Sequence, residues 1–385
     1  MHLIWATDDF TMAGRPYPGF PIVLHDSMES AVEVNQFLRH YLTRAVIESE
    51  RSWPNTGRAL YDYFGFIEAH DELDWKDVER GEEKTLLAAY RDYSLKDVKL
   101  ARNTVRQRLH YVCKFYDYAL DQGWIDRLPY GLEDRVVDRK DKGFLAHIDA
   151  SGNRQAVRDA MPRNHKSLPK FLSKDQVKAL LTAIENPHHL MITRHALQTG
   201  LRREEIATFP LSYVFNPDAR HGKGNTVKVT LDPYDGTGMK TKGMKEREIR
   251  ISRRFMADLY RYSVLQRGEL AAKSGVLQKT LFLTQDGLPY ANSGKSIEVM
   301  VRENAAKAGI KSHPHMLRHT YATHTLVAAQ RNPAAFGINP LVFLQRQLGH
   351  ASIATTMIYL HLVNELVDDA VLAYDDELND WLEVA

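Results

Sequence analysis

One stretch near the C-terminal end, His313–Leu362, limits the possible fold more than any other feature of this sequence. It contains histidine, arginine and tyrosine residues at fixed spacing. His315 and Arg318 lie three residues apart in a segment that is predicted to be helical, so both side chains can leave one face of a helix. His350 follows a Leu-Gly pair that ends a helix, and Tyr359 comes nine residues later. Two imidazoles, a guanidinium and a phenol brought to one place suit chemistry on a phosphate group.

Length and sequence pattern predict two domains, because 385 residues exceed the size of one typical hydrophobic core. Proline and glycine interrupt the first residues, which show no helical periodicity. A polar stretch of mixed charge after Pro129 is typical of a linker, with one short helix at about Arg154–Met161. The predicted segments are an extended N-terminal arm at 1–27, a helical domain at 28–130, a linker at 131–167, and a second domain at 168–385 that ends in an acidic tail at 365–385.

Apolar periodicity predicts a mainly α protein with a small antiparallel β-sheet in the second domain. The expected helices of the first domain are about Ser30–Leu42, Thr56–Ala69, Lys84–Tyr93 and Thr104–Asp121. In the second domain Ser173 is expected to cap a helix. Further along we expect a β-hairpin with strands Val227–Leu231 and Glu248–Ile251, a single helix at about Arg254–Ser274, and a strand and turn at Leu281–Leu288.

Three motifs in register resemble the C-terminal half of the tyrosine recombinases, the phage integrase family. They are H-x-L-R-H at His315–His319, L-G-H at Leu348–His350, and a tyrosine nine residues after that histidine. The segment Thr199–Glu205, with its Gly-Leu-Arg, resembles the other arginine motif of the family. The resemblance implies a two-domain clamp, in which a helical core-binding domain precedes the tyrosine-recombinase catalytic domain.

The resemblance also implies the roles of the site residues. These are Tyr359 as nucleophile, Arg202 and Arg318 as phosphate clamps, Glu205 as the residue that orients Arg202, His350 as a hydrogen-bond donor to a non-bridging oxygen, His315 in proton transfer, and Lys242 as general acid. A Gly stop followed by a surface salt bridge is the alternative for the Arg202 segment in isolation. His319, Tyr321, His324 and His361 are interpreted as packing or surface residues.

The position of the catalytic lysine depends on the register of the hairpin Lys240–Ile249, which resembles the lysine hairpin of the family. Counting back from Ile249 selects Lys242, while Lys240 and Lys245 are close enough to be mistaken for it. The proline that usually follows the apolar residue is replaced by Arg250. A solvated loop that contacts phosphate without a catalytic lysine is the alternative.

Basic residues on two segments are candidates for DNA contacts: Arg102, Arg106, Arg108 and Lys114 on the fourth helix, and Lys240, Lys245 and Arg247 on the hairpin. A solvated helix face is the alternative for the first group. The formal net charge of +2 neither supports nor excludes DNA binding, because residues 363–385 contain eight acidic residues and no lysine or arginine.

Other function classes are disfavoured by composition. Cys113 is the only cysteine, which excludes an internal disulfide and a thiolate zinc site built from this chain alone. No apolar run is long enough to cross a bilayer and no secretory signal is evident, so we expect a cytoplasmic, nucleoid-associated protein without membrane contact. We expect neither a metal nor ATP as cofactor, since no Walker-type loop or acidic metal cluster occurs.

The expected function is site-specific DNA strand exchange, such as integration of a mobile element, through a 3′-phosphotyrosyl intermediate with release of a 5′-hydroxyl. The expected partners are double-stranded DNA with specific recombination sites, further copies of this chain in a tetramer on paired sites, and accessory DNA-bending or directionality proteins. The resemblance implies that the tail at 365–385 docks on a neighbouring protomer, with folding back on its own domain as the alternative. The alternative functions are a type IB-like DNA topoisomerase and a non-catalytic DNA-binding regulator on the same fold.

Overall fold

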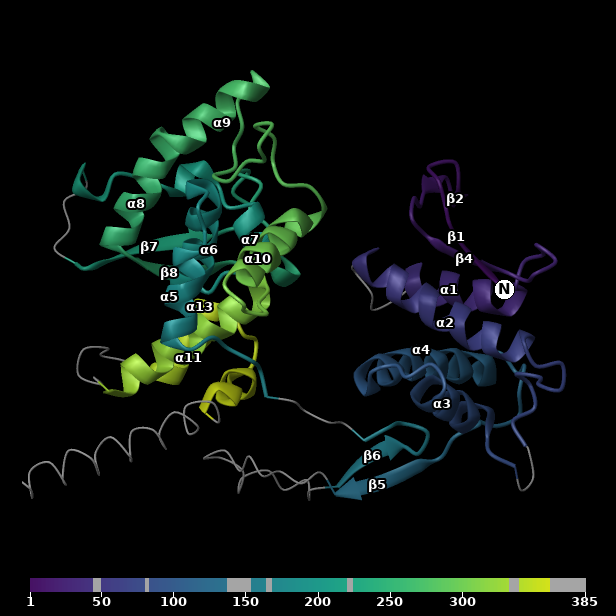
Figure 1. Ribbon diagram of the computed structural model, residues 1–385. Coiled ribbons are helices and arrows are strands. Elements are labelled where there is room, and N and C mark those ends of the chain that lie inside the picture. The colour runs from purple at the N-terminus through teal and green to yellow at the C-terminus, as the bar shows by residue number, and fades with distance from the viewer. Residues whose placement is uncertain are drawn as a thin grey trace, which may run out of the picture. The chain divides into compact units, whose positions relative to one another are not determined.

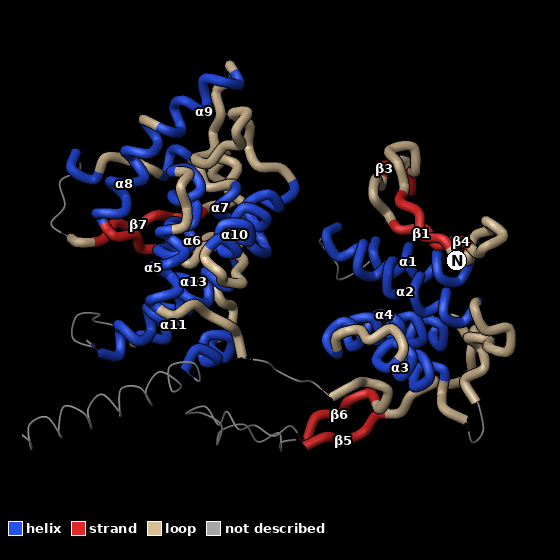
Figure 2. The backbone as a smooth tube through the Cα atoms, viewed as in Figure 1, coloured by secondary structure: helices blue, strands red, loops and turns tan. Residues whose placement is uncertain are grey.

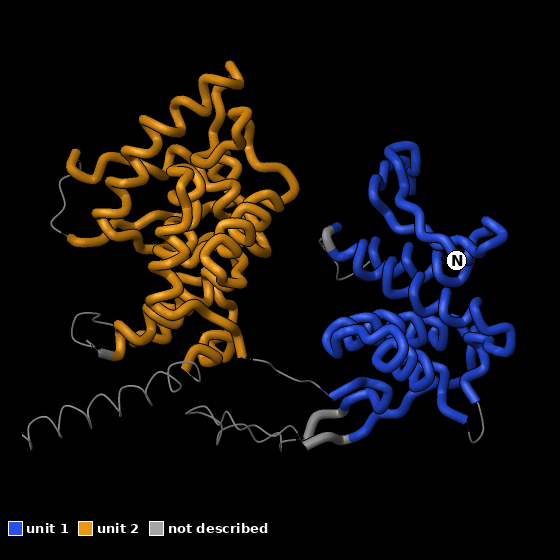
Figure 3. The backbone as a smooth tube through the Cα atoms, viewed as in Figure 1, with its two compact units in different colours: residues 1–166 blue, residues 167–385 orange. Residues whose placement is uncertain are grey.

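The computed structural model describes residues 1–43, 50–79, 83–136, 154–163, 168–219, 224–331 and 339–360. The chain divides into two compact units, Met1–Lys166 and Ser167–Ala385 (Figure 3). Most of the predicted linker and the whole acidic tail at 365–385, with its predicted docking, lie outside the described residues.

Unit 1 is a helical bundle with short strands at its N-terminal end. Strands β1 and β4 pair antiparallel over their full length and contact helices α1 and α2 (Figure 1). The predicted extended arm is therefore part of the packed unit. The elements are β1 (His2–Trp5), β2 (Thr11–Met12), β3 (Arg15–Pro16), β4 (Pro21–Leu24), α1 (Val32–Thr43), the 3₁₀ turn η1 (Glu50–Ser52), α2 (Trp53–Glu68), α3 (Leu86–Lys96) and α4 (Arg102–Asp121).

Aromatic side chains fill the core of unit 1. Phe115 of α4 is fully buried and meets Phe37 and Phe64 edge to face, with ring centroids 5.7 Å and 5.0 Å away. Tyr63 and Tyr116 are both fully buried, and their hydroxyls form a hydrogen bond with each other at 2.7 Å. Aromatic pairs of this geometry stabilise a fold beyond the area that they bury, by about 1 kcal/mol each.

The predicted short helix at Arg154–Met161 is wrong. Residues Leu132–Val136 form strand β5 and Arg154–Arg158 form strand β6, and the two strands pair antiparallel in full register. Ala160, which follows β6, is buried in the core of unit 1. The local helix signal in this segment is weak, and cross-strand pairing provides hydrogen-bond partners for its backbone N–H and C=O groups. The pairing also brings both ends of the expected linker into unit 1.

The described part of unit 2 is also mainly helical and contains a β-hairpin (Figure 2). Its elements are α5 (Lys174–Thr182), α6 (Pro187–Thr199), α7 (Arg203–Ala207), η2 (Leu211–Tyr213), η3 (Pro217–Ala219), β7 (Thr226–Leu231), η4 (Lys242–Met244), β8 (Arg247–Ser252), α8 (Arg253–Val264), α9 (Gln266–Ser274), η5 (Asn292–Gly294), α10 (Lys295–Lys307), α11 (Pro314–Arg331) and α13 (Pro340–Leu348). Residues 353–360 are helical as well. The predicted fold class, mainly α with small antiparallel sheets, is confirmed.

Local sequence signals set several boundaries in unit 2. Ser173 caps α5 in a capping box, as predicted. The predicted hairpin forms, with Val229 opposite Ile249 and both side chains turned into the core. The expected single helix at Arg254–Ser274 is instead α8 and α9, because Leu265 between them has non-helical backbone angles.

Two further observations complete the fold. The predicted strand at Leu281–Leu288 is reduced to an isolated bridge between Leu283 and Pro289, although Gly287 does adopt the left-handed conformation of a turn. None of the helices in the described part of the chain is long and apolar enough to cross a membrane.

Candidate active site

Arg318 lies at the centre of the site. It projects from α11 and is only 1% exposed, and its guanidinium donates to the carbonyl oxygens of Gly200 at 2.6 Å and Leu348 at 2.7 Å. These carbonyls end α6 and α13, so one side chain connects three helices. Gly200 is left-handed (φ 67°), and a Cβ there would come within 2.4 Å of the Tyr321 ring. The glycine of the predicted motif is therefore required for close packing as well as for the turn.

Glu205 holds Arg202, the other arginine of the predicted clamp, in place through hydrogen bonds. It lies in the first turn of α7 and is 1% exposed, and it accepts from the backbone N of Arg202 at 2.7 Å and from its Nη1 at 3.0 Å. Burial alone would raise the pKa of this carboxyl. The hydrogen bonds and positive charge supplied by Arg247 and Arg202 outweigh burial and lower the pKa to about 2. The predicted orienting role of Glu205 has a direct geometric basis.

Arg247, a predicted DNA contact, is largely buried and paired with Glu205. Its side chain is only 10% exposed and its two terminal nitrogens donate to the two carboxylate oxygens of Glu205, at 2.8 Å and 2.7 Å. It also donates to the carbonyl of Gln347 at 3.4 Å. A Cβ on Gly349 would lie 2.7 Å from the Arg247 side chain. Arg247 thus connects β8 to Glu205 and to the end of α13.

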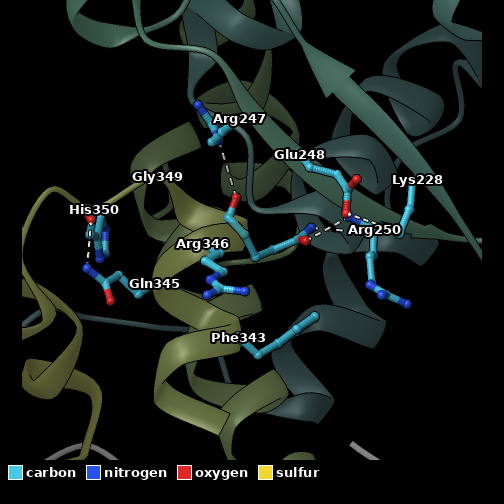
Figure 4. Close-up of a pocket in the computed structure, with 10 residues that line it drawn as sticks. Lys228, Arg247, Glu248, Arg250, Phe343, Gln345, Arg346, Gly349 and His350 are labelled. Atoms are coloured by element: carbon cyan, nitrogen blue, oxygen red, sulfur yellow. Dashed lines mark hydrogen bonds and ion pairs between the residues drawn. The ribbon is translucent and has the colours of Figure 1, made fainter. Parts of the chain in front are cut away.

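A pocket of about 690 Å³ adjoins these contacts, between the hairpin strands and α13 (Figure 4). Four basic side chains line it together with Phe343: Lys228, Arg247, Arg250 and Arg346. The side chain of Gln347 joins the two walls, since its oxygen accepts from the backbone N of Arg250 at 2.8 Å and its amide donates back to the Arg250 carbonyl at 3.1 Å.

His350 follows Gly349, whose left-handed conformation ends α13 as predicted. Its Nε2 lies 3.2 Å from Nη2 of Arg318 and its Nδ1 lies 3.0 Å from the hydroxyl of Thr356. Because a guanidinium only donates, Nε2 accepts and the neutral ring carries its proton on Nδ1. Burial, followed by the charges of Arg318 and Arg202, lowers the pKa of His350 to about 4.

Tyr359 lies in the helical segment 353–360 and is 2% exposed. Its ring stacks on that of His350, with centroids 6.3 Å apart and planes 8° apart. Its hydroxyl is hydrogen-bonded to Nδ1 of His319 at 2.8 Å. Burial raises the pKa of the phenol, while Arg318 and Arg202 act in the opposite direction. The predicted nucleophile and both predicted arginines therefore belong to one electrostatic cluster.

His319 was interpreted from the sequence as a packing or surface residue, and the structure places it against the predicted nucleophile. Its ring contacts Tyr359, and it lies beside His315 with ring centroids 4.3 Å apart. The available signal was its position, four residues after His315 and next to Arg318 on one predicted helix. Sequence spacing could not show which of the two histidines faces the phenol.

The three hairpin lysines Lys240, Lys242 and Lys245 are all exposed. Lys242 begins the 3₁₀ turn η4, where Gly243 is left-handed at φ 69°. Burial and the charge of Arg318 lower the pKa of His315, and the charge of Lys242 contributes to that shift. Lys242 is thus close enough to act electrostatically on His315, and the register of the catalytic lysine stays a prediction.

Three of the four candidate DNA contacts on α4 make contacts inside unit 1. Arg106 donates to the carbonyl of Pro162 and Arg108 pairs with Asp62. Lys114 lies 3.5 Å from Asp117, whereas Arg102 is exposed. A DNA-binding role for these four residues stays a prediction. In the described part of the chain, histidine, cysteine and carboxylate side chains do not gather in groups of three that could hold a metal ion.

Comparison with known proteins identifies the family. The model of the phage integrase family matches residues 170–365, which is just over half of the 385 residues. The chain therefore belongs to the phage integrase family. This integrase-family protein is 25% identical over 290 residues to tyrosine recombinase XerA of Pyrococcus horikoshii, covering 70% of this chain and 87% of XerA. It is 25% identical over 345 residues to tyrosine recombinase XerC of Lacticaseibacillus casei, covering 85% of this chain and 95% of XerC.

Solved structures of tyrosine recombinases share the fold of this integrase-family protein. The XerH recombinase bound to a palindromic difH substrate matches with a TM-score of 0.55 and 16% identity, covering 91% of this chain and 92% of XerH. A lambda integrase tetramer bound to a Holliday junction matches with a TM-score of 0.55 and 13% identity, covering 85% of this chain and 76% of that integrase. The resemblance inferred from the motifs is confirmed, and the protein is an enzyme of the tyrosine recombinase type.

Proposed function

We propose that this protein exchanges strands of double-stranded DNA at specific sites through a 3′-phosphotyrosyl intermediate and a free 5′-hydroxyl. The convergence of Arg318, Arg202 and Tyr359 from distant parts of the chain carries this proposal. Two guanidiniums beside a buried phenol form an arrangement that can bind a phosphodiester and stabilise the charge of its pentacoordinate transition state.

The two arginines have different geometric tasks. The Arg202 side chain is 23% exposed and is held by Glu205, so it can reach a phosphate from the surface. The Arg318 side chain is buried among backbone carbonyls, and burial followed by repulsion from Arg202 lowers its pKa to about 9, so it stays charged at neutral pH. Each would donate to non-bridging oxygens. His350 would be a further donor once its Nε2, which accepts from Arg318 before DNA binds, is protonated.

The leaving group needs a proton, because a 5′ alkoxide is a poor leaving group. Lys242 on the exposed hairpin would supply it. His315 is exposed at the start of α11, near the charge of Lys242, and would take part in proton transfer at the same phosphate. Since the bond energy of the phosphodiester is kept in the tyrosyl ester, the proposed reaction includes no step that consumes ATP.

The proposed assembly is a tetramer on paired recombination sites, in which the two units of each protomer clamp DNA. Unit 1 would be the core-binding domain, with Arg102, Arg106, Arg108 and Lys114 toward DNA, and Lys240, Lys245 and Arg247 would belong to the DNA surface of the hairpin. Support comes from the solved relatives, which include XerH on its difH site and a lambda integrase tetramer on a Holliday junction. Mobile-element DNA, accessory DNA-bending or directionality proteins, and a cytoplasmic, nucleoid-associated location complete the proposal.

Covalent trapping tests this function. A duplex selected by the full-length protein from a random-sequence library is nicked beside the cleavage position, so that the leaving strand dissociates and the adduct accumulates. Wild type should form a covalent adduct, Tyr359→Phe should bind the duplex without forming it, and Arg202→Ala and Arg318→Ala should lose most of it. Tyr260→Phe, at an exposed tyrosine on α8, is the matched control and should react as wild type.

An adduct that persists in Tyr359→Phe and maps to another tyrosine would contradict the assignment. Relaxation of a plasmid that lacks the selected site would favour the topoisomerase alternative, which the named relatives do not support.

A further inference from the structure

The hydroxyl of Tyr359 is hydrogen-bonded to a histidine outside the six predicted catalytic residues. The distance from Oη to Nδ1 of His319 is 2.8 Å, and the phenol is 2% exposed. The ring centroids of Tyr359 and His319 lie 5.7 Å apart and the ring planes are inclined at 51°. The imidazole therefore contacts the hydroxyl and does not stack on the phenol ring. This contact places an imidazole nitrogen directly against the hydroxyl of the proposed nucleophile.

The surroundings of His319 keep its ring neutral before DNA binds. The pKa of His319 is lowered to about 3, mainly by burial. The charges of its neighbours add to this shift, in the order His315, Arg318, His313 and His350. A neutral imidazole has one free nitrogen that can accept a proton. A bound phosphodiester brings negative charge to this cationic cluster, which favours the protonated ring at the moment of reaction.

His315, to which proton transfer was assigned from the sequence, is placed one step further away. Its ring contacts that of His319 at 4.3 Å between centroids, and the residue is exposed at the start of α11. His350 is also unsuited to take the proton of Tyr359, because its Nε2 accepts from Arg318 and its Nδ1 is committed to Thr356. The geometry therefore favours His319 over His315 and His350 as the residue that takes the phenolic proton.

We infer that His319 is a catalytic residue, the general base that removes the phenolic proton of Tyr359 during strand cleavage. The Tyr359 oxygen forms its bond to phosphorus as its proton passes to Nδ1 of His319, and the bond from phosphorus to the 5′ oxygen breaks as that oxygen takes a proton from Lys242. In ligation the same proton returns from His319 to the tyrosine oxygen. This inference rests on the proposed function, in which Tyr359 is the nucleophile.

Two substitutions at His319 separate basicity from packing. His319→Ala removes the acceptor, and His319→Asn retains a hydrogen-bonding group near the Nδ1 position but accepts no proton. Both should bind the selected duplex as wild type does and should form the covalent adduct about a hundredfold more slowly, within the usual range for loss of a general base. His324→Gln on the same helix is the matched control, since His324 contacts the backbone of Leu172 and not Tyr359.

A pair of chemical rescues makes the test specific. Incorporation of a fluorinated tyrosine at position 359 gives a more acidic phenol, which needs less help to lose its proton. It should restore much of the rate of His319→Ala and little of the rate of Lys242→Ala. A substrate with sulfur in place of the leaving 5′ oxygen should do the opposite, because a thiolate leaves without being protonated.

Each alternative result overturns the inference. Wild-type rates in His319→Ala would mean that the contact is a packing interaction. Faster cleavage would mean that the hydrogen bond holds the phenol in an unreactive position. Wild-type rates in His319→Asn would mean that the hydrogen bond matters and the basicity does not. A slow His319→Ala that the acidic tyrosine fails to rescue would indicate a structural defect. If wild type itself forms no adduct through Tyr359, the proposed function fails instead, before any His319 variant is compared.

Discussion

Replacement of Glu205 by glutamine tests whether one buried carboxylate holds the two arginines in place. The pKa of Glu205 is about 2 in the folded protein against an ordinary value of 4.5. At about 1.4 kcal/mol per pKa unit, the fold favours the ionised form by about 3 kcal/mol. Glu205→Gln loses this term and turns an amide donor toward the guanidinium of Arg247, so we expect about 3 kcal/mol of destabilisation, within the range for a broken buried ion pair.

Hydrogen exchange followed by mass spectrometry is the suitable assay, because it reports on each unit separately. Tryptophan fluorescence would follow mainly unit 1, which contains Trp5, Trp53, Trp75 and Trp124 of the five tryptophans. Protection of the most stable amides in unit 2 should fall about a hundredfold in Glu205→Gln, at 1.4 kcal/mol per factor of ten. Protection in unit 1 should stay the same.

The control is Glu248→Gln on strand β8. Glu248 pairs with Lys228 at 3.2 Å, but its side chain is 46% exposed, so the loss should stay below about 1 kcal/mol. A lowered pKa stabilises the fold above the unfolded value, so the advantage of wild type over Glu205→Gln should be full above pH 4.5 and shrink as the pH falls toward 2. Equal protection in the two glutamine variants, or a pH-independent difference, would refute this reasoning.

Three further predictions concern the hairpin, the turn before His350 and the tail. A 5′-thio substrate should rescue Lys242→Ala and leave Lys245→Ala unaffected, as measured by adduct formation; the reverse pattern would shift the hairpin register. Gly349→Ala should lower the thermal midpoint and slow cleavage, because its φ is 66° and the new Cβ would lie 2.7 Å from Arg247; an unchanged midpoint would mean that Arg247 moves aside freely. Truncation after Asn364 should leave one-site binding within about tenfold, or 1.4 kcal/mol, and abolish the two-site complex on native gels, whereas normal synapsis would make the tail intramolecular.

Local physical chemistry made the elements of unit 2 predictable. The capping box at Ser173, the glycine stops at Gly200 and Gly349, and the alternation that defines β7 and β8 are all set by residues within one turn or one strand of each other. The same local signals failed at Leu265 and at residues 154–158, where backbone pairing and packing outweigh weak periodicity. Helical spacing indicates which face a side chain leaves, and it carries no information about what lies opposite.

By itself the sequence determined the family and the helical class. It also predicted the nucleophile and the two clamping arginines, because fixed spacing in a helix or turn restricts which side chains can act together. The partners of those side chains were decided only by tertiary structure. Arg318 is bound to a carbonyl 118 residues away, Arg247 to a carboxylate 42 residues away, and Tyr359 to a histidine 40 residues away. Such contacts depend on how helices and strands pack across the core. That packing brings Arg247 to Glu205 and His319 to Tyr359.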